Sequence, residues 1–414
     1  MLQEYPEPNP NVRCWKMPQK LPLSGFVVLD MTHQVAGPFC SMLLADLGAE
    51  VIKIERPPTG DTARNWAYFG PSIFLALNRN KKSIALNLST PSGREAFEKL
   101  VKRADVFIEN LAPGAAKKLG ADYSTLRRAK KNIIYCSISG YGKNNPYSGL
   151  PAWDPVIQAL SGLMSVTGEK DREPVRIGVS VVDMGAGMTA ALGIVSSLLS
   201  KARNRKEASK SILLDISLFD SATVWMAFWV VYYSLYKKEP ERNGSAWPAF
   251  VPYQAFRAQD GYVFIGASNN DYWNKLCVSL GAESLLKEER FSTNELRIQN
   301  STELLRLLED ITSKIVRADL VTMLRKGEIP CSPVNNVKDL VNDVALGARG
   351  MIGEMLDPTG RKFLSVSNAL GVSGLGVKKP KAPPQLGRDT ARVLRSLGYS
   401  SSKTKRVLQE NQIH

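Results

Sequence analysis

Short apolar runs alternate with helical patterns along the first 218 residues of this 414-residue chain, and this alternation constrains the fold more than any other feature. The helix that follows residue 88 has Thr90 placed as its N-cap and Pro91 in its first turn. Repeated strand–helix–strand units predict an α/β domain around a parallel sheet. The strand-like runs are residues 25–31, 50–55, 83–88, 106–109, 133–139 and 212–218.

From about residue 252 the rhythm changes, which indicates a second domain. Residues 253–257 and 262–266 flank an Ala-Gln-Asp-Gly turn, and this pattern is typical of a β-hairpin. Helical patterns follow, and residues 351–356 and 363–366 suggest another hairpin. The tail from Gly387 onward forms two short helical patterns broken at Gly398. We therefore expect a smaller α+β domain and a C-terminal segment that docks elsewhere.

The charge and hydropathy of the chain limit its partners. The formal charge is +15, but the basic residues are spread along the whole sequence. Such a spread of positive charge indicates either a solvated surface or the binding of anions. Nucleic-acid-binding proteins gather their basic residues into a patch or stripe, and this sequence does not, so we expect no nucleic-acid partner. The most apolar run, residues 224–236, is too short to span a bilayer. We expect it to form a buried helix, and we expect no membrane association.

Histidine and cysteine usage excludes several kinds of chemistry. The only histidines are His33 and His414, so a catalytic triad would have to use His33, and a site with several histidine ligands cannot form. We therefore expect no metal. The five cysteines are scattered and contain no C-x-x-C pair, which favours a reducing compartment. Catalysis should depend on carboxylates, Lys, Tyr or backbone amides.

Polar residues follow several of the predicted strands. The loop 33–38 follows the first strand, Arg56 the second and Asn110 the fourth, and Tyr141 lies between two glycines after the fifth. The carboxyl ends of parallel strands meet at one edge of the sheet, so these residues predict a ligand site there. The G-x-G-x-x-G pattern is absent, which argues against a bound dinucleotide.

Asp183 has two possible roles. It follows a strand-like run at residues 175–182 and precedes Gly185, Gly187 and a long helical pattern. As a structural residue, it would be the N-cap of that helix. As a functional residue, it would be a nucleophilic carboxylate beside glycines that let a substrate approach the backbone, where amide groups could stabilise an oxyanion.

Taken together, these motifs resemble the class III coenzyme A transferases. The resemblance covers nearly the whole chain, and although each motif is weak alone, their order and spacing are specific. The matching pieces are DMTHQVAGP at 30–38, LGAEVIKIER at 47–56, NRNKKS at 78–83, Glu109-Asn110 with Pro113-Gly114, QALSG at 158–162, Thr167-Gly168, Asp183 with its glycines, and Gly387-Arg-Asp-Thr with Leu397-Gly-Tyr399.

The resemblance implies that Asp183 is the nucleophile and that CoA is a substrate, with no permanently bound cofactor and no metal. Lys118 stands where a relative carries Arg, and Ser139 where a relative carries Lys. A glycine-rich lid of the relatives is not recognisable beyond residues 243–245. The residues that the resemblance or the strand-end pattern places along CoA are Gln34, Val35, Ala36, Arg56, Asn110, Leu111, Lys118 and Tyr141.

The resemblance also implies a reaction and its substrates. CoA would pass from succinyl-CoA to glutarate or a similar dicarboxylate through an acyl-aspartyl anhydride and an aspartyl-CoA thioester. The loop 78–82 is either an ordinary turn or a cationic lip; as a lip, Arg79 backed by Lys82 would bind the far carboxylate of the acceptor. Gly185 and Gly187 would supply oxyanion donors. The alternative is a 2-methylacyl-CoA racemase, but the matching pair here is Trp153-Asp154, without the racemase histidine.

The family architecture implies a homodimer of two interlocked rings. Each chain would have a Rossmann-like large domain built from both chain ends, with a smaller α+β domain between. On this basis we assign residues 1–215 to the large domain, 216–250 to a helical linker, 251–335 to the small domain, and 336–414 to a return linker and the rest of the large domain. We expect a mitochondrial matrix location, with no transit peptide recognisable in the present N-terminus.

Overall fold

The computed structural model describes residues 21–370 and 376–410, which fall into two compact units. The first lies within residues 1–161, 178–228 and 346–414, and the second within 162–177 and 229–345. The first unit therefore combines described residues from the N-terminal and the C-terminal parts of the chain. Residues 162–177, which we assigned to the large domain, fall in the second unit instead. The reason is local: the N–H of Gly244 bonds to the carbonyl of Gly168, and Arg242 donates to the carbonyls of Glu169 and Arg172.

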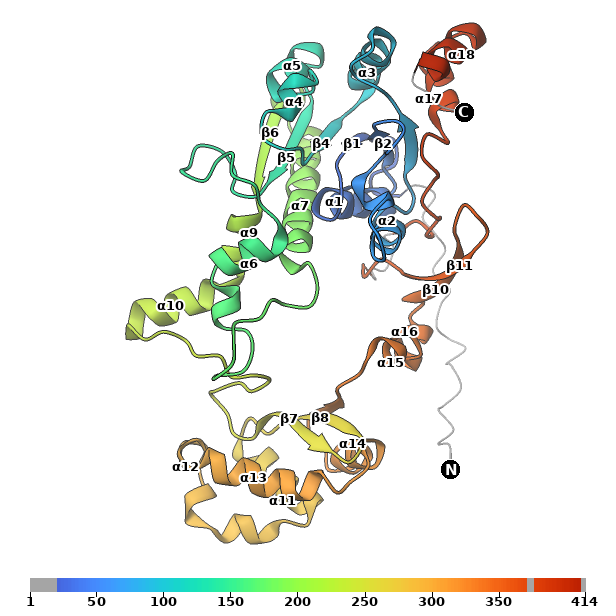
Figure 1. Cartoon of the computed structure of the whole chain (residues 1–414). Helices are drawn as coiled ribbons and strands as arrows, with labels where there is room; N and C mark the ends of the chain where they lie inside the picture. The colour runs from blue at the N-terminus through green and yellow to red at the C-terminus, as the bar shows by residue number, and fades with distance from the viewer. Residues whose placement is uncertain (1–20, 371–375, 411–414) are drawn as a thin grey trace. The chain divides into compact units, whose positions relative to one another are not determined.

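A six-stranded parallel sheet forms the centre of the first unit (Figure 1). Its strand order is β3-β2-β1-β4-β5-β6, which is the Rossmann order. The strands are nearly continuous apolar runs because helices cover both faces of the sheet. Five of the six predicted strands are confirmed to within two residues, and the predicted strand at 83–88 ends earlier than expected. The strands are β1 (Val27–Met31), β2 (Glu50–Glu55), β3 (Lys82–Ala85), β4 (Val106–Glu109), β5 (Ile134–Ser139) and β6 (Ile212–Ser217).

Helices cover the two faces of this sheet. On one face α1 (Ala36–Asp46) packs against α7 (Val181–Arg203). On the other, α3 (Pro91–Arg103) and α5 (Tyr123–Ala129) bury Phe97, Leu100 and Leu126 against the strands. The hydroxyl of Thr90 accepts a hydrogen bond from the N–H of Gly93, which confirms Thr90 as the N-cap of α3. α7 is apolar enough to cross a membrane, with a mean hydropathy of 1.5, but half of that stretch is buried in the protein.

The C-terminal tail docks on the outer strand of the same sheet. α17 (Thr390–Ser396) and α18 (Ser401–Glu410) are the two predicted short helices. The N–H of Ser83 donates to the Asp389 carboxylate, and the N–H of Ala85 donates to the Thr390 hydroxyl. Val393, Leu394 and Val407 complete the core formed by β1–β4 and α3. The expected docking of the tail is therefore confirmed, and its site is β3.

Two predicted elements before residue 240 are not present as expected. Residues 175–180 form no strand, and α7 begins at Val181. The apolar run 224–236 is not a buried helix: it is divided between α9 (Leu218–Trp225) and α10 (Ala227–Tyr236). Val224, Val231 and Leu235 in this run are 71%, 56% and 68% exposed in the single chain. Hydrophobicity alone did not show that this run lies on the surface.

The second unit is a small α+β structure. β7 (Tyr253–Ala258) and β8 (Gly261–Gly266) form the predicted hairpin, and β9 (Cys331–Pro333) adds a third antiparallel strand. α11 (Asn270–Leu280), α13 (Ser301–Thr312) and α14 (Arg317–Lys326) pack on this sheet around Trp273 and Phe291. The second predicted hairpin, β10 (Ile352–Leu356) with β11 (Lys362–Val366), belongs to the first unit. The remaining α-helices are α2 (Gly70–Leu77), α4 (Ala115–Lys118), α6 (Asp154–Leu160), α8 (Arg205–Ala208), α12 (Asn294–Gln299), α15 (Val337–Val341) and α16 (Val344–Ala348).

Candidate active site

A cavity of about 320 Å³ opens at the carboxyl ends of β1, β4 and β5. The sheet order reverses between β1 and β4, and in open α/β sheets ligands bind where this happens. His33 and Gln34 follow β1, Asn110 to Pro113 follow β4, and Ser139 to Gly142 include and follow the end of β5. Asp183 from the first turn of α7 and Asp154 from α6 complete the acidic part of the wall.

A second cavity continues along the same edge of the sheet, over the ends of β1, β2 and β3. It shares His33 and Leu111 with the first cavity, so these two residues stand at the junction. Arg56 lines the second cavity, as does the segment 86–89 that follows β3. An elongated ligand could thus extend from Arg56 past His33 to Asp183. Arg56 is a cation at one end of this path, and the Asp183 carboxylate lies at the other end.

Asp183 is the third residue of α7, not its N-cap. Ser180 holds the N-cap position, and its side chain makes no capping hydrogen bond. Instead, the carboxylate of Asp154 caps the helix by accepting the N–H of Val182 at 2.8 Å and that of Asp183 at 3.0 Å. Gln158, one turn along α6, donates to the same Asp154 carboxylate. The sequence pattern did not reveal this cap because it comes from a residue 28 positions earlier.

The pKa of Asp183 is raised to about 7, first by burial and then by the negative charge of Asp154. A carboxylate near a helix N-terminus is normally stabilised by the helix dipole and by free N–H groups. Here Asp154 already occupies the N–H groups of Val182 and Asp183. Asp183 is therefore a destabilised carboxylate on a cavity wall, which is the state expected of a nucleophile rather than of a cap.

The loop after β1 is fixed from two sides. The side chain of Asn110 accepts the N–H of His33 at 2.8 Å and donates to its carbonyl at 2.9 Å. Gln34 has a positive φ of 68°, and its N–H donates to the carboxylate of Asp61. Positive φ is costly for a residue with a side chain, so the loop depends on these contacts.

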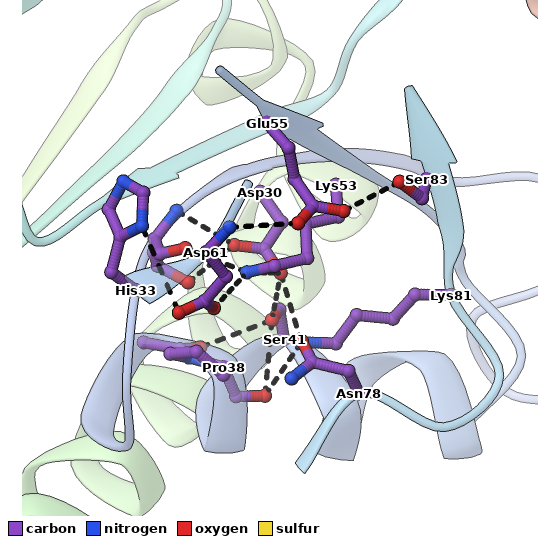
Figure 2. Close-up of polar contacts among 12 residues, drawn as sticks. Asp30, His33, Pro38, Ser41, Lys53, Glu55, Asp61, Asn78, Lys81 and Ser83 are labelled. Atoms are coloured by element: carbon purple, nitrogen blue, oxygen red, sulfur yellow. Dashed lines mark hydrogen bonds and ion pairs between the residues drawn. The ribbon is translucent and has the colours of Figure 1, made fainter. Parts of the chain in front are cut away.

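A buried cluster of charged residues supports this loop from behind (Figure 2). Lys53 Nζ lies 2.9 Å from Asp61 and donates to the Thr32 carbonyl, and Lys81 Nζ lies 3.0 Å from Asp30. Burial alone would raise the pKa of Asp30, but Lys53 and Lys81 overcome this and hold it well below its usual range. Burial disfavours the charged form of Lys81 as well, and for a lysine this lowers the pKa, to about 8. Because both lysines and both aspartates have a partner of opposite charge, none of these four charges is buried alone behind the loop.

Comparison with known proteins identifies the family. The model of "CoA-transferase family III" matches residues 23–390. The chain belongs to CoA-transferase family III. A succinyl-CoA:glutarate CoA-transferase of Mus musculus is 37% identical over 94% of this chain and 89% of its own length. A succinate–glutarate CoA-transferase of Agrobacterium fabrum is 31% identical over 92% of this chain and 96% of its own length. A crystal structure of a CAIB/BAIF family protein from Brucella suis superposes with a TM-score of 0.84 at 36% identity, covering 92% and 100% of the two chains.

In this family III CoA-transferase most of the predicted CoA-contacting residues lie on the two cavities. Gln34, Ala36, Asn110, Leu111 and Tyr141 line the first, and Arg56 and Leu111 line the second. Val35 and Lys118 line neither cavity, although Leu119, the neighbour of Lys118, lines the second.

The predicted oxyanion role of Gly185 and Gly187 is contradicted. Both lie inside α7, where N–H groups bond to carbonyls one turn earlier. A β-carbon at Gly187 would lie 2.6 Å from the Ala36 carbonyl oxygen, and one at Gly185 would lie 2.8 Å from the Trp225 ring. The glycines therefore permit close packing of α7 on α1 and α9.

The predicted acceptor clamp is also contradicted. Arg79 is 4% exposed, donates to the carboxylate of Asp46 and to the carbonyl of Val366, and lines neither cavity. Lys82 pairs with Glu50 at 2.6 Å and lines neither cavity. The basic loop 78–82 is thus a structural turn. Within residues 21–370 and 376–410, no Lys or Arg lines the cavity that holds Asp183.

The residues at the site that the sequence did not predict include two groups of neighbours. Residues 86–89 line the second cavity, and residues 149–152 line the first. Residues 86–89 follow β3 as Asn110 follows β4, so the same strand-end argument could have found them. Residues 149–152 lie in a loop that no local pattern distinguishes. In the described part of the chain, no group of three or more His, Cys, Asp and Glu residues could hold a metal ion.

Proposed function

We propose that this chain transfers CoA from succinyl-CoA to glutarate or a similar dicarboxylate, with Asp183 as the nucleophile. The observation that carries the proposal is the carboxylate of Asp183, with its pKa raised to about 7, on the wall of a cavity at the reversal point of the sheet. A second cavity that contains Arg56 continues from it and would take the anionic end of CoA. Family membership supports the reaction class.

The proposed reaction has four steps. The Asp183 carboxylate attacks the thioester carbonyl, the C–S bond breaks, and an acyl-aspartyl anhydride forms with release of CoA thiolate. The thiolate then attacks the carbonyl carbon of Asp183, which releases the donor acid and leaves an aspartyl-CoA thioester. The acceptor carboxylate attacks this thioester, giving a second anhydride and thiolate. Attack of that thiolate on the acceptor carbonyl yields the new acyl-CoA and restores Asp183.

The proposed substrates rest on the relatives, since the names of the mouse and bacterial proteins pair succinate or succinyl-CoA with glutarate. The test is to incubate the purified chain with succinyl-CoA and a panel of mono- and dicarboxylic acids and to identify new acyl-CoAs by mass spectrometry. Glutaryl-CoA should form fastest. If no acid in the panel accepts CoA, the proposed transfer is wrong; if a monocarboxylate is preferred, only the acceptor assignment is wrong.

The racemase alternative is disfavoured by Trp153. This residue lines the cavity beside Asp154 and occupies the position where the racemase branch carries histidine. An indole cannot remove a proton from C2 of an acyl-CoA. Incubation of a 2-methylacyl-CoA in D₂O separates the two reactions: incorporation of deuterium at C2 would favour the racemase.

We also propose that the enzyme is a homodimer in the mitochondrial matrix. The exposed apolar side chains of Val224, Val231 and Leu235 support the dimer, because a second copy would remove them from water. The interlocked rings and the location follow from the resemblance alone. Light scattering of the purified chain should give twice the monomer mass, and microscopy of the full-length gene product should show mitochondria. A monomeric mass or a diffuse signal would contradict the respective proposal.

A further inference from the structure

His33 stands at the junction of the two cavities and is used by none of the steps above. It lines both cavities, and its side chain is 27% exposed. Asn110 holds its backbone N–H and carbonyl, so the imidazole projects from a fixed point. Any ligand that extends from Arg56 to Asp183 must pass this ring.

The two ring nitrogens have different surroundings (Figure 2). Nδ1 is buried without a hydrogen-bond partner and lies 3.9 Å from Oδ1 of Asp61. The other oxygen of the Asp61 carboxylate, Oδ2, is paired with Lys53. The distance between Nδ1 and Oδ1 is too long for a hydrogen bond, but a proton on Nδ1 would face the negative oxygen, whereas a lone pair there would be repelled by it. Asp61 therefore favours the tautomer that carries its proton on Nδ1.

The ring should also be neutral. Burial lowers the pKa of His33, the cation of Lys53 lowers it further, and the opposing charges of Asp61, Asp30 and Glu55 do not restore it. In a neutral ring protonated on Nδ1, Nε2 is a hydrogen-bond acceptor. Figure 2 shows this second nitrogen on the side of the ring away from Asp61 and the charged cluster. Within the described residues, the hydrogen bonds of His33 are made by its backbone N–H and carbonyl, and its contact with Asp61 is made by Nδ1.

We propose that Nε2 of His33 accepts a hydrogen bond from an amide N–H of the pantetheine arm of CoA, and so fixes how far the arm reaches toward Asp183. The inference rests on the proposed function, since it takes CoA as the ligand of the two cavities. The arm carries two amides between its phosphate end and its thioester. An amide N–H that leaves water without an acceptor costs free energy, and a fixed acceptor at the junction removes that cost.

The test compares two substitutions at one position. His33→Gln keeps an acceptor oxygen near the position of Nε2, whereas His33→Leu keeps the bulk and removes the acceptor. His33→Leu should raise KM for succinyl-CoA about 10-fold with a smaller change in kcat, and His33→Gln should stay within about threefold of wild type. Equal losses in both variants would overturn the proposal, because a merely structural role would not separate them. Melting temperatures of both variants show whether either is unfolded.

A second measurement uses a changed substrate. Succinyl-CoA analogues with an ester in place of one pantetheine amide have no N–H at that point. One of the two analogues lacks the N–H that His33 binds. With that analogue the hydrogen bond is already absent in wild type, so wild type and His33→Leu should have the same KM. A persistent difference with each of the two analogues would overturn the hydrogen bond. If wild type transfers no CoA from succinyl-CoA at all, the proposed function has failed; if wild type is active but the variants do not separate, only the role of His33 has failed.

The tautomer is open to direct observation. Because the chain has only two histidines, spectra of ¹⁵N-histidine-labelled protein can be assigned with a His414→Gln variant. His33 should remain neutral with its proton on Nδ1, and its Nε2 resonance should shift when CoA is added. A proton on Nε2 in the free protein, or an Nε2 resonance unmoved by saturating CoA, would contradict the assignment.

Discussion

The carboxylate of Asp154 accepts a 3.0 Å hydrogen bond from the backbone N–H of Asp183, so that one acid caps the helix whose first turn carries the other. Because Asp154 takes up the free N–H groups, the helix terminus no longer stabilises a negative charge on Asp183. Its own negative charge adds to the burial of Asp183, and the pKa of Asp183 rises to about 7. A destabilised carboxylate is a stronger nucleophile, at the expense of being partly protonated near neutral pH.

The first prediction is a pH dependence of transfer. Attack requires ionised Asp183, so kcat/KM should rise with pH and level off above about 7. Asp154→Asn keeps the shape of the cap and removes its charge, so the pKa of Asp183 should fall and the rising limb should move to lower pH. Initial rates of glutaryl-CoA formation between pH 5 and 9 measure this. Asp310→Asn, on an exposed residue of α13, is the control and should leave the profile unchanged. An Asp154→Asn profile identical to wild type would show that Asp154 does not act electrostatically.

The second prediction concerns stability. The pKa of Asp183 is about 7 in the folded chain against an ordinary value of 3.8 for an aspartate in water, so the folded state binds the proton more tightly. Well below pH 4 both states are protonated, and Asp183 does not affect the free energy of unfolding. Between pH 4 and 7 Asp183 becomes increasingly destabilising, and above pH 7 it lowers the free energy of unfolding by roughly 4 kcal/mol. Asp183→Asn removes this cost, so its advantage in melting temperature over wild type should increase from pH 5 to pH 8. A difference that does not change with pH would contradict the raised pKa.

The third prediction is that Asp183→Ala abolishes transfer while CoA affinity stays nearly unchanged. The reaction needs the carboxylate itself, whereas CoA would be held along the strand ends at Arg56 and His33. Activity should fall below roughly 1% of wild type, which corresponds to a loss of about 3 kcal/mol or more of transition-state stabilisation. Calorimetric titration with CoA provides the control, since weak binding would mean that the variant damages the cavity. Retention of a larger rate would exclude a covalent role for Asp183.

The sequence predicted most of the α/β unit because parallel strands buried on both faces are short apolar runs that local pattern identifies. It also placed Arg56, Asn110 and Tyr141 at one sheet edge, because strand ends follow from strand positions. It failed where the partner is distant along the chain. The cap of α7 comes from Asp154, and the counter-ion of Arg79 is Asp46, 33 residues away. From the sequence, Gly187 was predicted to let the substrate approach the backbone. In the structure Gly187 instead lets α7 pack closely on α1, a contact between elements that local sequence does not show.

The fourth prediction replaces the expected role of Arg79. Arg79→Met should destabilise the fold and leave KM for glutarate nearly unchanged, because the side chain is bound to Asp46 rather than to a cavity. Breaking a buried pair leaves one uncompensated charge and costs about 3–5 kcal/mol. Chemical denaturation measures the loss. Lys82→Met is the matched control: it breaks a partly exposed pair with Glu50 and should cost no more than about 1 kcal/mol. A glutarate-specific rise in KM for Arg79→Met would show that Arg79 meets the acceptor after all.

The last prediction tests the covalent route. The experiment uses enzyme in excess over succinyl-CoA, together with glutarate that carries ¹⁸O in its carboxylates. A single turnover should then release unlabelled succinate. The reason is atom balance: the oxygen that succinate gains comes from Asp183, and the oxygen that glutarate loses stays on Asp183. Direct attack of glutarate on succinyl-CoA would instead pass the ¹⁸O to succinate in the first turnover. Peptide mass spectrometry should then find ¹⁸O on Asp183, and hydroxylamine should modify Asp183 only when an acyl-CoA is present. Labelled succinate from the first turnover, with no label on Asp183, would favour transfer within a ternary complex, and Asp183 would then act by its charge rather than as a nucleophile.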